Sequence, residues 1–95
     1  MDEQGVKHDP AGRKLYISFG AEVAFLAYTQ TGKVLDAYEV FVPEAFRGQG
    51  IAEKLGIAAF GYAKREGLKI RPSCPYLATT FLAKHPELKG LVAKG

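Results

Sequence analysis

The chain has 95 residues, of which 47% are hydrophobic and 24% are charged, and its formal net charge is +3. A chain of this length buries roughly 60–65% of its unfolded surface, which allows one hydrophobic core and no second one. Its single cysteine, Cys74, excludes an internal disulfide framework and a cysteine-rich zinc site. Because the two histidines are widely spaced, no metal site is predicted.

Hydropathy and charge patterning narrow the setting in which the protein acts. No apolar stretch approaches the ~20 residues of a membrane span, and residues 1–5 lack the apolar centre of a signal peptide. A free thiol suits a reducing compartment. No run of consecutive Lys or Arg forms a basic stripe, so nucleic acid is not an expected partner. We expect a soluble cytoplasmic protein, monomeric or a small homo-oligomer, with no membrane partner.

The first half of the chain predicts an antiparallel meander of three strands. Alternating apolar side chains predict a strand over residues 15–19 and a second strand over residues 22–29. Residues 30–33 form a turn, and a third strand runs from about 34 to 42, where Pro43 ends it.

The second half predicts helices alternating with one further strand. Apolar residues recur at helical spacing over residues 51–66, and a short strand follows over residues 68–71. A helix between two strands implies a right-handed crossover to a parallel neighbour. Residues 76–84 are predicted to form a second helix, and residues 87–95 a weakly ordered tail.

The order βββαβα predicts an α+β fold. Its central sheet is mixed, an antiparallel meander plus one parallel strand, with helices packed on it. Residues 1–12 are expected to be a flexible lead-in, and residues 13–95 the single domain.

A glycine-rich loop joins the third strand to the long helix and has the features of a phosphate site. Gly48 and Gly50 let the backbone approach a ligand closely, and Arg47 adds a fork of donors suited to phosphate oxygens. The helix start adds unpaired amides and the positive end of the helix dipole. A diphosphate fits this combination best. The chain has neither the G-x-G-x-x-G of a dinucleotide fold nor a P-loop, and a turn that merely connects strand to helix is the alternative.

The motif Arg47-x-x-Gly50-x-Ala52 resembles the Q/R-x-x-G-x-G/A signature of the GNAT superfamily of N-acetyltransferases. The chain is similar in particular to the small stand-alone YjdJ-like group, over roughly residues 13–93. The segments that carry this resemblance are Val42-Pro43-Glu44, the loop itself, Pro72-Ser73-Cys74-Pro75-Tyr76 and Lys84-His85-Pro86-Glu87.

The resemblance implies acetyl-CoA as cofactor and a function for each of several positions. Phe41 and Val42 would face the pantetheine or the acyl group, and Cys74 would lie near the thioester. The chain departs from the family at Glu39, where members tend to carry histidine, so a histidine-based acid or base is in doubt. The backbone expected to hold the CoA pyrophosphate is that of Arg47, Gly48, Gln49, Gly50, Ile51 and Ala52.

Two residues are the predicted catalytic candidates. Glu39 alternates with Ala37 and Phe41, which predicts a carboxylate on an apolar strand face, suited to take a proton from an ammonium substrate. The alternative is a carboxylate at a cavity edge paired with a surface cation. Cys74 is a candidate nucleophile or proton donor to the departing thiolate, or else a small buried hydrophobe. Tyr76 is a further candidate proton donor, with a packing role as its alternative.

These features predict an acetyl-CoA-dependent N-acetyltransferase that transfers the acyl group directly to an amine, either a small molecule or a protein. The alternative is a non-catalytic acyl-CoA-binding or regulatory module. The sequence does not identify the acceptor.

Overall fold

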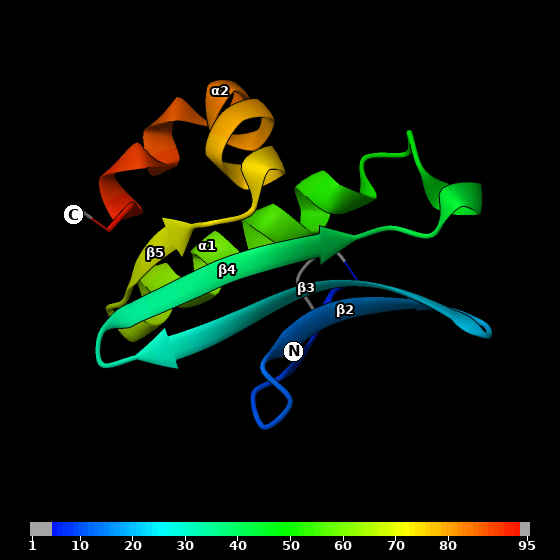
Figure 1. The fold of residues 1–95 in the computed structure, drawn as a ribbon, viewed down its shortest axis with the longest axis horizontal. Coiled ribbons are helices and arrows are strands. Elements are labelled where there is room, and N and C mark those ends of the chain that lie inside the picture. The colour runs from blue at the N-terminus through cyan, green and yellow to red at the C-terminus, as the bar shows by residue number, and fades with distance from the viewer. Residues whose placement is uncertain (1–4, 94–95) are drawn as a thin grey trace.

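The computed structural model describes residues 5–93, and its strands form one five-stranded sheet in the order β1-β2-β3-β4-β5. The first three neighbouring pairs are antiparallel, and the last pair, β4 with β5, is parallel. Helices pack on this sheet, as Figure 1 shows. The predicted α+β class with a mixed sheet is confirmed, and the predicted order of elements gains one strand at its start.

The meander consists of β2 (Lys14–Phe19), β3 (Glu22–Thr31) and β4 (Val34–Phe41). Side chains alternate between the two faces of the sheet because the strand period is two residues. Leu15 and Leu26 lie opposite each other in the β2–β3 register and both are buried on the face covered by the long helix.

The first twelve residues contain a strand where the sequence predicts a flexible lead-in. Strand β1 (Lys7–Asp9) pairs with β2 at the edge of the sheet, and Val6 just before it is buried in the core. Three residues, all of them polar, are too few to show an alternation, so the sequence pattern does not reveal this strand. Residues 1–4 of the predicted lead-in lie outside the described part of the chain.

The two parallel strands run together only over their first part. β5 (Lys69–Pro72) pairs with β4 from Val34 to Ala37, whereas β4 continues to Phe41. The backbone amide of Cys74 donates the next hydrogen bond, of 3.0 Å, to the carbonyl oxygen of Ala37. Beyond this point the end of β4 and the segment after β5 diverge (Figure 1).

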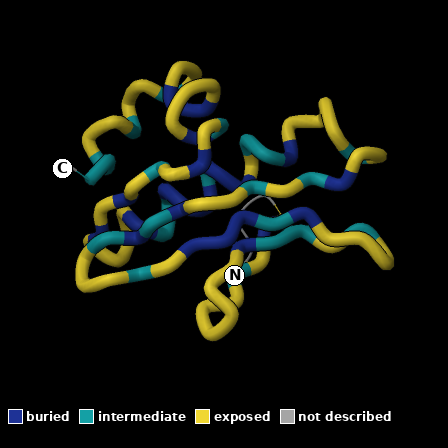
Figure 2. The backbone as a smooth tube through the Cα atoms, viewed as in Figure 1, coloured by how far each residue is buried: buried dark blue, intermediate teal, exposed yellow. Residues whose placement is uncertain are grey.

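Helix α1 (Ile51–Glu66) packs on the sheet and supplies much of the core. Leu55 and Phe60 are fully buried, and small alanines between them let the helix lie close to the strands. A Cβ built on Gly56 would lie only 2.6 Å from the Cε1 atom of Phe81, so the missing side chain makes room for the second helical segment. Figure 2 shows the buried residues gathered between the sheet and α1.

The predicted second helix is present in two parts. A π-helical turn (Leu77–Phe81) leads directly into α2 (Leu82–Lys84). After it, a 3₁₀ helix (Pro86–Leu91) replaces part of the predicted weakly ordered tail. The tail is ordered here because Val92 forms a bridge with Ile70 and three of its apolar residues pack on the core. Residues 94–95 of the predicted tail lie outside the described residues.

None of the helices in residues 5–93 combines the length and the hydropathy needed to cross a membrane.

Candidate active site

The loop between β4 and α1 is anchored on the sheet. Residues Glu44–Phe46 form a 3₁₀ turn, in which the Phe46 ring stacks on the Phe19 ring with centroids 4.2 Å apart. The Nε atom of Arg47 donates a hydrogen bond of 2.9 Å to the carbonyl oxygen of Val42. Arg47 is exposed, so this single bond orients the guanidinium while leaving its other donors accessible.

Two glycines shape the loop so that α1 begins with free amides. Gly48 (φ 80°) and Gly50 (φ 76°) adopt the left-handed backbone that glycine reaches without steric cost. Gly50 is the N-cap of α1 and makes no side-chain cap, and its carbonyl accepts the bond from the Lys54 amide at 3.1 Å. The backbone amides of residues 51–53 therefore have no hydrogen-bond acceptor within the helix. Together with the helix dipole, they favour binding of an anion.

A cavity of about 220 Å³ opens beside these amides. One wall is the loop with the first turn of α1, and the other wall belongs to the segment from the end of β5 through α2. On that second wall, Tyr76, Thr80 and Lys84 follow one another at four-residue intervals and so share one side of the helical segment. The lining residues are Val42, Phe46, Arg47, Gly48, Gly50, Ile51, Ala52, Glu53, Tyr76, Thr80 and Lys84.

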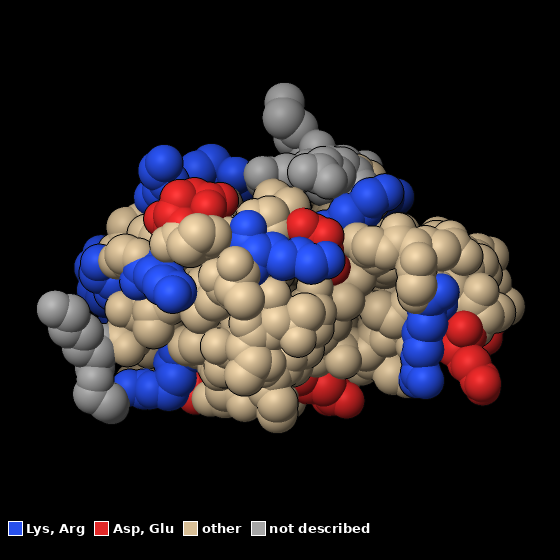
Figure 3. Space-filling model, turned by 90° about the horizontal axis from the view of Figure 1, so that it is seen from above, with Lys and Arg blue, Asp and Glu red and all other residues tan. Residues whose placement is uncertain are grey.

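The electrostatic character of the cavity is mixed. Arg47 and Lys84 bring positive charge to its lining, while Glu53 brings a carboxylate. Burial raises the pKa of the Tyr76 phenol above its ordinary value of 10.0, and the nearby Glu53 and Cys74 raise it further. The phenol is therefore fully protonated at neutral pH. On the face seen in Figure 3, Lys and Arg side chains stand in separate groups with Asp and Glu among them.

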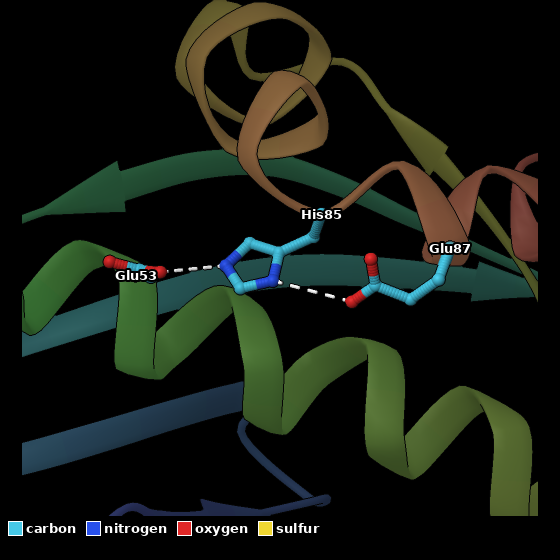
Figure 4. Close-up of polar contacts among 3 residues, drawn as sticks. All are labelled: Glu53, His85 and Glu87. Atoms are coloured by element: carbon cyan, nitrogen blue, oxygen red, sulfur yellow. Dashed lines mark hydrogen bonds and ion pairs between the residues drawn. The ribbon is translucent and has the colours of Figure 1, made fainter.

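A histidine ties the two walls of the cavity together. The Nε2 atom of His85 lies 2.7 Å from the Oε2 atom of Glu53, and its Nδ1 atom lies 3.5 Å from the Oε2 atom of Glu87 (Figure 4). His85 follows α2 directly, and Glu53 belongs to the first turn of α1, so the contact joins the second wall to the first. Within residues 5–93, no group of three or more His, Cys, Asp or Glu side chains is suited to hold a metal ion.

With this geometry established, comparison with known proteins assigns the family. The model of a family described as GCN5-related N-acetyl-transferase matches residues 14–91. The chain belongs to this GCN5-related family.

Relatives agree with this assignment, and a solved structure shares the fold. Protein NATD1 of Gallus gallus is 35% identical over 82 residues, which cover 79% of this chain and 74% of that protein. Protein NATD1 of Homo sapiens is likewise 35% identical over 82 residues, covering 79% of this chain and 73% of that protein. The solution NMR structure of a GCN5-like protein from Staphylococcus aureus has the same fold, with a TM-score of 0.73 at 23% identity. It covers 100% of this chain and 93% of that chain.

In this GCN5-related domain, six of the eight residues predicted to bind the cofactor lie together at the cavity. The two others do not line it. Phe41 is 40% exposed on the opposite face of the sheet, and Gln49 is exposed on the loop. The six that line it are Val42, Arg47, Gly48, Gly50, Ile51 and Ala52.

The two predicted catalytic residues lie outside the cavity lining. Cys74 follows β5 directly and is buried, with 6% of its surface exposed. It lies near Tyr76, which lines the cavity, and raises the pKa of the Tyr76 phenol. Glu39 is exposed on β4, and its side chain does not share the buried face of Ala37.

An irregularity in β4 explains why the expected position of Glu39 was wrong. Neighbouring residues of β3, Ala27 and Tyr28, face Glu39 and Ala37, so Tyr38 is an extra residue on β4. The inserted residue shifts the alternation, so that Val40 packs toward the core and Glu39 beside it points to the other face. A simple period of two had placed Glu39 and Ala37 on the same face.

Four cavity residues were missed at the sequence level. Phe46 and Glu53 flank the glycine motif but have no phosphate-binding chemistry of their own. The other two, Thr80 and Lys84, carry a recognisable signal, because together with Tyr76 they recur every four residues in a segment already predicted to be helical.

Proposed function

We propose that this chain is an acyl-CoA-dependent N-acetyltransferase that transfers the acyl group directly to an amine. Membership of the GCN5-related family supports this activity. The observation that carries the proposal is the cavity itself, which combines the uncapped start of α1, two cationic side chains and a protonated phenol.

The residues present fit the diphosphate of coenzyme A. A Cβ at Gly48 or Gly50 would meet no heavy atom within 4 Å, so a ligand can approach the backbone of the loop. Free amides of the first turn of α1 would bind the phosphate oxygens, with Arg47 and Lys84 as the flanking cations. When bound, the cofactor supplies an acyl group activated as a thioester.

The cavity is small for a whole cofactor. Pockets that enclose a drug-sized ligand measure roughly 300–1,000 Å³, whereas this one measures about 220 Å³. It accommodates the diphosphate and the neighbouring part of the cofactor, and the remainder would lie along the surface. The diverging end of β4 offers backbone groups for that part beyond Ala37, where β5 no longer pairs with it.

Tyr76 is the residue of the cavity best suited to proton transfer. Its raised pKa keeps the hydroxyl protonated at neutral pH, so it can donate a proton to a departing thiolate. The two residues predicted from the sequence to be catalytic both lie outside the cavity lining, Cys74 buried and Glu39 exposed on the other face of the sheet, so the proposal assigns the proton transfer to Tyr76 and no step to either of them.

Binding and turnover are measured separately to test the proposal. Addition of CoA at about 100 times its Kd should stabilise the protein by ~2.7 kcal/mol, which corresponds to a rise in Tm of roughly 10–20 °C for a chain of this size. ATP and NAD serve as ligand controls. Release of free CoA from acetyl-CoA is then followed with a panel of small amines and lysine-containing peptides.

The outcomes distinguish the two functions considered. Stabilisation by CoA together with amine-dependent CoA release establishes the acetyltransferase. Stabilisation without turnover on any acceptor favours the non-catalytic acyl-CoA-binding module. Equal effects of CoA, ATP and NAD, or no effect of CoA, contradict cofactor binding at this cavity.

A further inference from the structure

Glu53 occupies a position from which it should obstruct the anion site that it borders. It is the third residue of α1, and a glutamate at this helix position commonly folds back to accept a hydrogen bond from the backbone amide of the N-cap residue. Here the N-cap is Gly50, which has no capping side chain. A carboxylate folded back in this way would cover the free amides and repel a phosphate.

The carboxylate of Glu53 is instead directed toward the opposite wall. Its Oε2 atom lies 2.7 Å from the Nε2 atom of His85, at a distance typical of a charge-assisted hydrogen bond (Figure 4). The side chain of His85 is 18% exposed and that of Glu53 is 33% exposed, so this contact is partly shielded from water.

His85 is held firmly by its surroundings. Its backbone amide donates to the carbonyl oxygen of Phe81 at 3.1 Å, and its own carbonyl accepts from the amide of Leu88 at 3.0 Å. Its ring lies 4.7 Å, centroid to centroid, from the ring of Phe81, which is fully buried against Gly56. The imidazole is therefore a fixed partner that can retain a flexible carboxylate.

We propose that His85 is a positioning residue that keeps the amides at the start of α1 free for an anion by holding the carboxylate of Glu53 away from them. The inference rests on the proposed function, because those amides are the proposed site of the CoA diphosphate. His85 acts through Glu53 and does not itself line the cavity.

A double-mutant cycle on CoA binding tests this role. His85→Leu keeps an apolar contact with Phe81 but releases Glu53, and it should raise the Kd for CoA by about tenfold. Glu53→Ala removes the obstructing group, so its Kd should equal or fall below that of the wild type. In the Glu53→Ala background, His85→Leu should then have no further effect.

Two more variants serve as rescue and as matched control. His85→Gln retains a side-chain donor for Glu53 and should recover most of the affinity lost in His85→Leu. Glu87→Ala removes the more distant carboxylate, 3.5 Å from the other ring nitrogen, and should leave the Kd within about twofold of the wild type. Circular dichroism and melting curves establish that each variant is folded.

A second readout does not depend on the cofactor. In the absence of ligand, the amide proton resonance of Gly50 should move downfield in His85→Leu, because Glu53 then accepts its hydrogen bond, and should return in the double variant. A Gly50 resonance that stays in place in His85→Leu overturns the inference. Equal losses of CoA affinity in Glu53→Ala and His85→Leu overturn it as well, whereas absent CoA binding by the wild type contradicts only the proposed function.

Discussion

Tyr76 lines the cavity, and burial, Glu53 and Cys74 all raise the pKa of its phenol. The assignment of Tyr76 as proton donor predicts a large effect of removing one oxygen. Tyr76→Phe keeps the ring but should lower kcat about 100-fold, with KM for acetyl-CoA changed by less than about threefold. Initial rates of CoA release measure both constants.

The variant Cys74→Ala is the comparison for Tyr76→Phe. Cys74 is buried and outside the cavity lining, so Cys74→Ala should lower kcat by less than about fivefold, and mass spectrometry should find no acetyl group on Cys74 of the wild type. A variant Tyr76→Phe with full kcat beside an inactive Cys74→Ala would reverse the two roles.

At the scale of elements, the contact between α1 and the second helical segment depends on a single missing side chain. Gly56→Ala gains about 1 kcal/mol of helix propensity, but the new Cβ would lie 2.6–3.0 Å from three ring atoms of Phe81. Overpacking of this kind costs typically 1–3 kcal/mol, so we expect a net destabilisation of up to about 2 kcal/mol in urea unfolding. Phe81→Leu in the same chain should recover part of the loss, and a more stable Gly56→Ala would contradict the close packing.

Some elements and contacts of this protein were predictable from its sequence, and others were not. The long strands and α1 were predictable because each repeats its hydrophobic period several times, and Arg47, Gly48 and Gly50 were predictable because their chemistry is local to the loop. The bulge at Tyr38 was not, since one inserted residue is defined by pairing with another strand. The contact of Glu53 with His85, separated by 32 residues, likewise exists only through the packing of two elements.

At the scale of the whole molecule, His8 on strand β1 makes the free energy of unfolding depend on pH. His8 lies beside Tyr62, with ring centroids 4.4 Å apart, and its Nε2 atom is 2.6 Å from the Tyr28 hydroxyl oxygen. Burial lowers the pKa of His8 below 6.5, an effect that Arg65 reinforces and Asp9 opposes. The unfolded chain therefore binds a proton at a higher pH than the folded chain, so stability present above pH 6.5 is lost as the pH falls below it.

The dependence of Tm on pH should differ between the wild type and the variant His8→Gln. Between pH 7.5 and 5.5, the Tm of the wild type should fall by a few degrees more than the Tm of His8→Gln, in which no imidazole titrates at position 8. Other carboxyl and histidine groups titrate equally in both proteins and cancel in the comparison. Parallel curves of Tm against pH would show that His8 has no such effect.

The pairing of Val92 with Ile70 has a consequence for self-association. A sheet edge with free amides and carbonyls can recruit a strand of another molecule and begin aggregation. On the β5 side, Val92 bridges to Ile70 and the Ala93 amide donates to the Ile70 carbonyl at 2.7 Å, so the chain covers part of its own edge. On the other side, β1 has only three residues and is followed by Pro10. Both margins of the sheet thus disfavour strand-to-strand addition between copies.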